Sequence, residues 1–201
     1  MIIAVEGIDG AGKHTLVDAT VKRLPATTLA FPRYGDSAAA QLAQAALHGK
    51  MGDMPDSAYG MAAMFALDRH GAAEVLREYA GDPERTLILD RYCASNAAYT
   101  WARTGDEAAL AWVEDLEFGR LGLPRPDLQV LLPTPPGVAG ERAERREATD
   151  AQRPRDRYER DDALQRATAE AYAELAKRGW AGRWVVTDDP AVIIETIRSL
   201  A

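Results

Sequence analysis

The sequence contains a single cysteine, lacks a long uncharged apolar run, and carries no excess of positive charge. One cysteine, Cys93, excludes a disulfide framework within the chain and a metal site built on several cysteines. No apolar run reaches the roughly 18 residues that a membrane-spanning helix needs. The N-terminus begins with an apolar strand pattern, without the basic region or cleavage site of a secretory signal. We therefore expect a protein of the reducing cytoplasm with no membrane partner.

The charge balance is negative, because 24 Lys and Arg residues face 31 Asp and Glu residues and give a net charge of −7. This balance argues against broad electrostatic binding to nucleic acid, so we expect no nucleic-acid partner. The composition, with 47% hydrophobic and 27% charged residues, is typical of a soluble globular protein. The positive charge is nevertheless clustered, since seven of the 24 Lys and Arg residues lie between Arg142 and Arg160.

Short apolar segments alternate with helical patterns along the 201 residues. Apolar segments without polar alternation indicate strands buried on both faces, and helices between them predict a parallel sheet with helices on both faces. We expect one α/β domain over residues 1–201, with no repeat, linker or low-complexity tail. The expected strands are residues 1–6, 27–31, 86–90, 128–132 and 183–187. The expected helices are residues 13–24, 37–48, 57–79, 95–103, 106–121 and 158–177, with a further helix start at Pro135 and Pro136.

A glycine-rich loop, VEGIDGAGKHT over residues 5–15, follows the first expected strand. Gly7, Gly12 and Lys13 match the pattern G-x-x-x-x-G-K, in which backbone N–H groups and a helix N-terminus hold phosphate oxygens. The lysine adds a positive charge for a phosphoryl group. The alternative is an ordinary strand-to-helix turn with a surface lysine. The order of strand, loop and helix favours the phosphate-binding loop.

One position of this loop departs from the pattern. A Ser or Thr usually follows the lysine and ligates Mg²⁺, whereas this chain has His14, a poor ligand for that hard cation. Thr15 lies about 100° further around the helix, so it is not an obvious substitute. The metal would then depend on phosphates and carboxylates, and Asp9 inside the loop is well placed. Two alternatives stay open for His14, which are contact with phosphate when protonated and exposure to solvent.

Three further motifs follow in order: FPRYG at residues 31–35, LDRYCASNAAY at 89–99 and the basic segment ERAERREATDAQRPRDRYERD at 141–161. With EGIDGAGK at 6–13, they make the chain closely resemble bacterial thymidylate kinases over nearly its whole length, and DRYxxSxxAY is the most specific element. The resemblance implies a P-loop kinase with a five-stranded parallel sheet, an Arg-rich lid near residues 137–157, and a homodimer. It also implies transfer of the terminal phosphoryl group of ATP to dTMP, with Mg²⁺. His14 and the short connection LPAT at 24–27 depart from the family pattern.

The resemblance assigns roles to the residues that match the family's motifs. The residues implied for ATP are Gly7, Asp9, Gly10, Ala11, Gly12, Lys13, His14 and Thr15. The residues implied for dTMP are Asp9, Phe31, Tyr34, Phe65, Arg69, Arg91, Ser95, Asn96, Tyr99 and Tyr158. The catalytic residues are implied to be Asp9, Lys13, Arg91, Arg146 and Arg153, and the metal ligands Asp9 and Glu159.

The base-binding residues have a physical rationale. Phe65 and Arg69 are four positions apart on one expected helix, so they share a face on which one could stack a base and the other bind its edge. A guanidinium only donates, so Arg69 can meet the O4 acceptor of thymine but not the N4 amine of cytosine. Asn96, with donors and acceptors, would read the ring N3 edge. The alternative is that Phe65 is core, with Met61 and Met64, and that Arg69 is a solvated charge.

The third strand is followed by residues that suit the acceptor phosphate and sugar. Arg91 lies where ligands bind in open parallel sheets, and the resemblance implies that it holds the dTMP phosphate with the help of Tyr34. Tyr99 resembles the family tyrosine beneath the deoxyribose, and Ser95 lies on the same side of the helix. The alternative for Tyr99 is a buried ring anchored by its hydroxyl. Asp90 would orient metal-bound water or hold Arg91.

The basic segment could close over the polyphosphate as a lid that excludes water. The alternative is a helix with surface ion pairs, because acidic residues alternate with these arginines. We assign the functional role to Arg146 and Arg153 and treat the other arginines as mostly solvated. Asp156, with Glu159 three residues later, also forms a capping-box pattern. The resemblance instead places Tyr158 and Glu159 at the nucleotide, with Glu159 near Mg²⁺, and both interpretations stay open.

Overall fold

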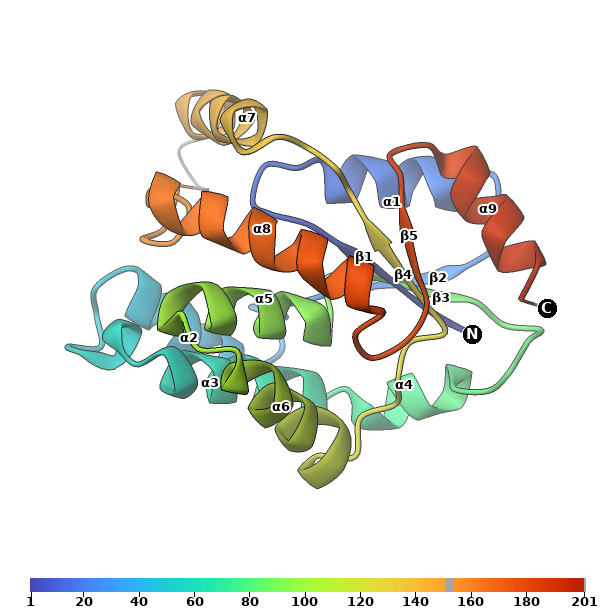
Figure 1. The fold of residues 1–201 in the computed structure, drawn as a ribbon, viewed down its shortest axis with the longest axis horizontal. Helices are drawn as coiled ribbons and strands as arrows, with labels where there is room; N and C mark the ends of the chain where they lie inside the picture. Colours follow the sequence, from blue (N-terminus) through green and yellow to red (C-terminus); the bar gives the residue numbers. More distant parts are fainter. Residues whose placement is uncertain (151–153, 201) are drawn as a thin grey trace.

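The computed structural model describes residues 1–150 and 154–200. Within these ranges, five parallel strands form one sheet in the order β2-β3-β1-β4-β5 (Figure 1). The strands are β1 (Ile2–Glu6), β2 (Thr27–Ala30), β3 (Leu87–Asp90), β4 (Leu128–Leu131) and β5 (Trp184–Val186). The central strand, β1, is buried along its whole length, as its uninterrupted apolar sequence predicts. The predicted five-stranded parallel fold is confirmed.

Helices cover both faces of the sheet (Figure 1). On one side α1 packs beside α9, whereas α5 and α8 pack together on the other. The helices are α1 (Lys13–Val21), α2 (Ala38–Leu47), α3 (Ala58–His70), α4 (Ala73–Tyr79), α5 (Cys93–Thr104), α6 (Ala108–Glu114), α7 (Pro136–Thr149), α8 (Asp162–Arg178) and α9 (Pro190–Arg198). Two shorter segments are the 3-10 turn η1 (Met54–Asp56) and the π-helical η2 (Asp115–Arg120).

The long helix expected over residues 57–79 is two helices, α3 and α4. The break lies at Gly71, where an added Cβ would come 2.6 Å from Nη2 of Arg33. The same Nη2 donates to the carbonyl of Asp68 in the last turn of α3, at 2.5 Å. Arg33 therefore occupies the end of α3 and prevents a continuous helix. The arginine comes from the distant FPRYG motif, so the local pattern could not predict this break.

The helix expected from residue 158 begins later, at Asp162. Its N-cap is Asp161, whose carboxylate accepts a hydrogen bond from the N–H of Leu164 at 2.9 Å. Asp156 does accept from the N–H groups of Tyr158 and Glu159, at 2.8 and 2.9 Å, but these bonds close a separate turn before the helix. The α7 helix begins at Pro136 as expected, whereas α9 was not expected from the sequence.

The hydrophobic core has two parts. The larger cluster joins the strands to helices on both faces and includes the fully buried Tyr92, Tyr172 and Leu175. A smaller cluster lies between α2 and α3, where Tyr158 closes it and Phe65 packs against it half-buried. Gly10, in the loop after β1, lies close to the backbone of Ala139 in α7, the helix that falls in the expected lid segment. Among the described residues, no helix combines the length and apolar character that crossing a membrane requires.

Candidate active site

The loop after β1 leaves the N-terminus of α1 open to a ligand. Gly12 is its N-cap, with φ +100°, and no described side chain caps the first N–H groups of the helix. Such uncapped N–H groups, at the positive end of a helix dipole, suit a phosphate. The lid helix packs directly on the loop, because an added Cβ at Gly10 would lie 2.1 Å from the carbonyl oxygen of Ala139. Glycine at this position therefore allows the lid to approach the phosphate loop.

Lys13 is buried at the first position of α1. Its Nζ donates to the carbonyl oxygens of Gly7 and Ile8 at 3.0 and 2.9 Å, so the side chain folds back over the loop. Burial and then the nearby positive charge of Arg91 lower the pKa of Lys13 to about 8, against an attraction to Asp9. The lysine is therefore a buried cation held at the loop, and the alternative of an exposed surface lysine is wrong.

Asp9 is the centre of the polar network at the loop. Its carboxylate pairs with Nη2 of Arg91 and accepts from the hydroxyl of Tyr99 at 2.6 Å and from Nε2 of Gln165 at 3.2 Å. Burial alone would raise the pKa of Asp9, but the charges of Arg91 and Lys13 outweigh it and lower the pKa to about 2. The predicted residues Asp9, Lys13, Arg91 and Tyr99 therefore lie together, and the carboxylate of Asp9 is ionised and held by several hydrogen bonds.

Arg91 has an unusual backbone conformation, with φ +69°. A non-glycine residue in the left-handed region costs of order 1–3 kcal/mol, and such positions cluster at functional sites. Nη1 of Arg91 donates to the carbonyl oxygen of Gly7 and to Oγ of Ser95, both at 3.1 Å. The guanidinium carbon lies 5.7 Å from the centre of the Tyr99 ring. These contacts direct the guanidinium across the mouth of the phosphate loop.

Glu6 is a buried carboxylate that the sequence analysis assigned only to a strand end. It is 0% exposed, and it accepts from the N–H of Tyr92 at 2.8 Å, Oγ of Ser95 at 2.6 Å and the hydroxyl of Tyr172 at 3.0 Å. Burial raises its pKa above the ordinary value. Ser95, which also bonds Arg91, thus connects this carboxylate to the site. The signal in the sequence is an acidic residue that ends a fully apolar strand.

The predicted base-reading residues also come together. Nε and Nη2 of Arg69 donate to the two carboxylate oxygens of Glu117, at 2.5 and 2.7 Å. Nδ2 of Asn96 donates to Glu117 at 2.7 Å and to the carbonyl oxygen of Ala62 at 3.0 Å. Arg69 and Glu117 are both buried, so the alternative of a solvated arginine is wrong. Glu117 was not among the predicted site residues, although it follows Leu110 and Val113 on the same apolar helix face.

Aromatic side chains lie beside the Asp9 network, because the hydroxyl of Tyr99 donates to Asp9. The rings of Tyr99 and Tyr158 stack, with centres 6.1 Å apart and an angle of 15° between their planes. The buried hydroxyl of Tyr158 has no hydrogen-bond partner among residues 1–150 and 154–200. Tyr34 is half-buried, and burial followed by the charges of Asp156 and Asp9 raises its pKa. Phe31 is buried in the main core, and its ring centre lies 6.2 Å from that of Tyr92.

The lid arginines are mostly engaged in ion pairs. Nη2 of Arg146 pairs with Glu159, and its buried Nε has no hydrogen-bond partner within the described part of the chain. Arg142, grouped in the sequence analysis with the solvated arginines, instead donates through Nη1 to the carbonyl oxygen of Ala11 in the phosphate loop at 3.2 Å. Arg153 lies outside the described residues. The remaining pairs are Arg145 with Glu141, Arg155 with Glu144 and Glu147, Arg157 with Asp56, and Arg160 with Glu147.

The loop position that departs from the family pattern points away from this network. His14 has a side chain that is 83% exposed and lies 3.4 Å from the carboxylate of Asp18, one helical turn later. Thr15 is exposed as well. The carboxylates of Asp9 and Glu159 are better ligands for Mg²⁺ than the side chain of His14. Burial, followed by the negative charge of Asp9, raises the pKa of Glu159, as expected for acidic groups that face one another.

Among the described residues, no group of three or more His, Cys, Asp or Glu side chains could by itself hold a metal ion. Asp9 and Glu159 supply the hard oxygen ligands that Mg²⁺ prefers, and this ion usually completes its shell with water and substrate phosphates. The residues present therefore fit a magnesium ion that arrives with a nucleotide. They do not form a closed protein site for the metal.

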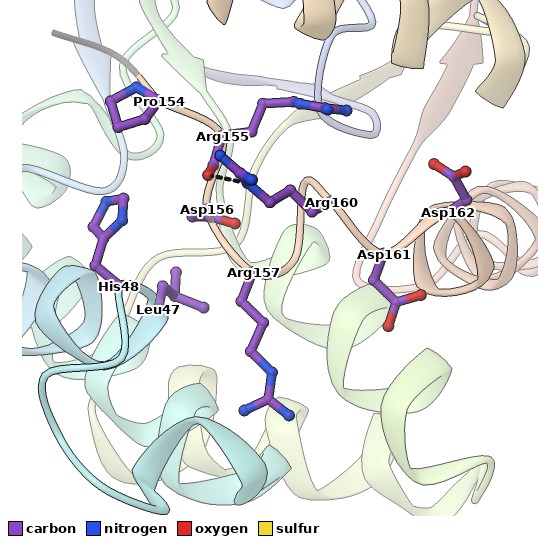
Figure 2. A pocket seen from close by; sticks show the side chains of 9 residues that line it. All are labelled: Leu47, His48, Pro154, Arg155, Asp156, Arg157, Arg160, Asp161 and Asp162. Carbon is purple, nitrogen blue, oxygen red and sulfur yellow. Dashed lines mark hydrogen bonds between the residues drawn. The ribbon is translucent and has the colours of Figure 1, made fainter. Parts of the chain in front are cut away.

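The described residues also line a cavity of about 710 Å³ (Figure 2). It lies between the end of α2 and the segment that leads into α8, and it shares Asp156 with the surroundings of Asp9. Three arginines line it, but each is already paired with a carboxylate. The cavity is lined by Leu47, His48, Pro154, Arg155, Asp156, Arg157, Arg160, Asp161 and Asp162.

The single cysteine lies beside the carboxylate of Glu117. Cys93, at the first position of α5, is 1% exposed, and burial raises the pKa of its thiol well above the ordinary value. A thiol of this kind is a small hydrophobic group and not a nucleophile.

The chain is similar to known proteins over nearly its whole length. The family model described as thymidylate kinase matches residues 5–194. The chain is 50% identical to the thymidylate kinase of Mycobacterium tuberculosis, over 98% of this chain and 97% of that protein. It is 32% identical to a probable thymidylate kinase of Pyrobaculum calidifontis, over 100% and 99%.

Two solved structures share the fold at low sequence identity. A thymidylate kinase from Candida albicans aligns with a TM-score of 0.68 and 20% identity, over 100% of this chain and 93% of that one. A deoxyadenosine kinase from M. mycoides aligns with a TM-score of 0.67 and 16% identity, over 99% and 97%.

Proposed function

Because the chain belongs to the thymidylate kinase family and so transfers the terminal phosphoryl group of ATP to dTMP, we propose that Asp9, Lys13 and Arg91 form the centre of that transfer. The observation that carries the proposal is the carboxylate of Asp9, which Arg91, Tyr99 and Gln165 contact at once beside a buried lysine. Phosphoryl transfer needs in-line positioning and neutralisation of charge more than covalent chemistry from the protein.

The ATP phosphates would bind on the loop from Gly7 to Thr15. The N–H groups at the start of α1 face this position, and Lys13 would move from its carbonyl partners to the transferring phosphoryl group. His14 belongs to this loop only through its backbone, because its side chain faces Asp18. The lid arginines Arg146 and Arg153 would complete the charge clamp.

The dTMP phosphate would bind at Arg91, with Tyr34 beside it. Ser95 holds the guanidinium of Arg91, and Tyr99 would lie beneath the deoxyribose with Tyr158 stacked upon it. The base would lie between Phe65 and the polar pair Arg69 and Asn96. Phe31 would close the far side of this base pocket.

Mg²⁺ would be held by Asp9 and Glu159 together with the nucleotide. When bound, the ion would neutralise negative charge on the phosphates during the transfer. The support from this chain is the mutual repulsion of these carboxylates, which a cation would relieve. Arg146, paired with Glu159, would then link the lid to the same region.

Two broader proposals concern the surroundings of the enzyme. We propose that the protein acts as a homodimer, because α2 and α3 expose large apolar side chains, namely Leu42, Tyr59 and Leu67. We also propose that it acts in the reducing cytoplasm, because its single cysteine, Cys93, is a free and buried thiol, as is usual for proteins of that compartment.

The substitution Asp9→Asn tests the catalytic proposal. It keeps the shape of the side chain but removes the charge that faces Arg91, so we expect kcat to fall by about a hundredfold or more while the fold is kept. The matched control is Asp18→Asn, on the exposed side of α1, which should leave steady-state kinetics unchanged. A kcat within about twofold of the unmodified enzyme for Asp9→Asn would refute the assignment.

A further inference from the structure

Glu117 joins the two side chains that would read the base. It is 0% exposed and lies in η2, directly after α6, while Arg69 comes from α3 and Asn96 from α5. One carboxylate oxygen, Oε1, accepts from both Nη2 of Arg69 and Nδ2 of Asn96, each at 2.7 Å. The other oxygen accepts from Nε of Arg69. A single buried group thus orients residues from two other helices.

The chemistry of these bonds fixes which way the Asn96 amide faces. A carboxylate and a backbone carbonyl only accept hydrogen bonds, so both groups that contact this amide, Glu117 and the carbonyl of Ala62, require its NH₂ end. The NH₂ group is then fully used. The Oδ1 atom is the end of Asn96 that remains for another ligand, and it can only accept.

Arg69 is constrained in the complementary sense. Two of its nitrogens are committed to Glu117, which leaves N–H groups on Nη1 and Nη2 that can only donate. The proposed base site would therefore offer an acceptor on Asn96 and donors on Arg69. The Watson–Crick edge of thymine, an N3–H donor beside the O4 acceptor, matches this pattern, whereas cytosine has an N3 acceptor beside an N4 amine and mismatches at both positions.

We propose that Glu117 is a positioning residue for base specificity, which sets the hydrogen-bond polarity of the base pocket through Asn96 and Arg69. The proposal rests on the proposed dTMP site and assigns to it a determinant beyond the side chains that touch the base. A pocket that hydrogen-bonds its substrate rejects a mismatched analogue strongly, because buried polar groups would be left unpaired.

Glu117 lies within a π-helical turn that directly follows α6. The N–H of Leu121 bonds the carbonyl of Leu116 at 2.9 Å, which is a π-type bond in a helix otherwise of α type. π-helical turns are uncommon and occur often at functional sites. Val113 and Glu117 lie four positions apart on the buried side, so Glu117 occupies a position where an apolar residue would ordinarily pack.

A purely structural role would look different in an experiment. A buried ion pair that only held α3, α5 and η2 together would, when broken, lower stability and all activities alike. A positioning role instead changes dTMP binding and base selectivity and leaves ATP binding intact. The substrate pair that separates the two is dTMP and 5-methyl-dCMP, which share the methyl group and differ only at the hydrogen-bonding edge.

The central experiment is Glu117→Gln, measured with ATP, dTMP and 5-methyl-dCMP. The glutamine keeps only one acceptor oxygen, and its NH₂ would face an N–H of Arg69 or Asn96, so the three bonds by which Glu117 orients these two side chains cannot all be kept. We expect KM for dTMP to rise about tenfold or more, KM for ATP to stay within about twofold, and the preference for dTMP over 5-methyl-dCMP to fall by about tenfold. The matched control is Glu114→Gln, at the end of α6, where the side chain is 40% exposed and pairs with Arg125, which should change none of these values.

Two further measurements separate failure of this inference from failure of the dTMP site. Asn96→Ala should raise KM for dTMP if the base binds there, and unchanged kinetics would reject the site itself. If Asn96→Ala raises KM but Glu117→Gln preserves both KM and selectivity, only the role of Glu117 is refuted.

If Glu117→Gln does not fold, calorimetry on the unmodified protein takes its place. Equal affinity for dTMP and 5-methyl-dCMP would overturn the fixed hydrogen-bond polarity, and a weaker affinity for 5-methyl-dCMP would support it.

Discussion

Asp9 bonds side chains from three separate parts of the chain. Three groups from different parts of the chain contact its carboxylate: Arg91 after β3, Tyr99 in α5 and Gln165 in α8. With a pKa lowered to about 2, the side chain is ionised at neutral pH. A movement of α5 or α8 therefore changes the environment of a permanent negative charge beside the phosphate loop.

Lys13 gives a prediction about pH. Its pKa of about 8 lies below the ordinary value, so in the free enzyme the charge is complete below that pH and is lost as the pH rises through it. We expect kcat/KM for ATP, which reports the free enzyme, to fall by about tenfold per pH unit above this value. Lys13→Arg retains its charge at every accessible pH, so its profile should lack this alkaline limb. A flat profile for the unmodified enzyme up to about pH 10 would contradict the assignment.

His14 gives a prediction of the opposite kind, namely that little changes. Its side chain is exposed, and its contact with Asp18 is a surface pair of the sort that contributes about 0–1 kcal/mol. We therefore expect His14→Ser to keep kcat and both KM values within about twofold in the presence of Mg²⁺. A loss of more than about tenfold would show that the imidazole reaches the nucleotide in the working enzyme.

At the scale of elements, the lid helix and the phosphate loop form one unit. The carbonyl of Ala139 in α7 occupies the space that a side chain at Gly10 would need. The substitution Gly10→Ala must therefore displace the lid or distort the loop, and the φ of +76° adds further strain. We expect kcat/KM for ATP to fall by about tenfold or more, measured by steady-state kinetics.

The same helix offers the control for this substitution. Gly137, in the first turn of α7, has no described atom within 4 Å of an added Cβ, so Gly137→Ala should leave the kinetics unchanged. Equal kinetics for Gly10→Ala and the unmodified enzyme would mean that the lid does not rest on the loop during turnover.

The sequence predicted the elements where the determining signals are local. Apolar runs revealed the five strands, and the glycine spacing revealed the loop and the start of α1. Local sequence patterns did not predict features that depend on a residue far along the chain. Arg33 ends α3 from 35 positions before its partner Asp68, and the pairing of Arg69 with Glu117 spans 48 positions. No local pattern contains such a pairing, so the break after α3 and the role of Glu117 needed the three-dimensional structure.

At the scale of the whole molecule, the exposed apolar surface predicts an assembly. Leu67 in α3 is 48% exposed and Leu42 in α2 is 43% exposed, and large exposed apolar side chains of this kind are ones that a partner subunit can cover. We expect sedimentation analysis to show a dimer for the unmodified protein and a monomer for Leu67→Glu. The control is Val186→Glu, on the edge strand β5, which is 54% exposed but belongs to a different surface and should leave the dimer intact. A monomer for the unmodified protein would refute the assembly.

The burial of Cys93 has a practical consequence. The chain contains no other cysteine, and this thiol is enclosed beneath α5 and kept protonated. A cysteine introduced on the outer face of α7 would therefore be the single site that a maleimide dye modifies. The unaltered chain is thus a ready background for fluorescence recordings of lid opening, with no native thiol to remove first.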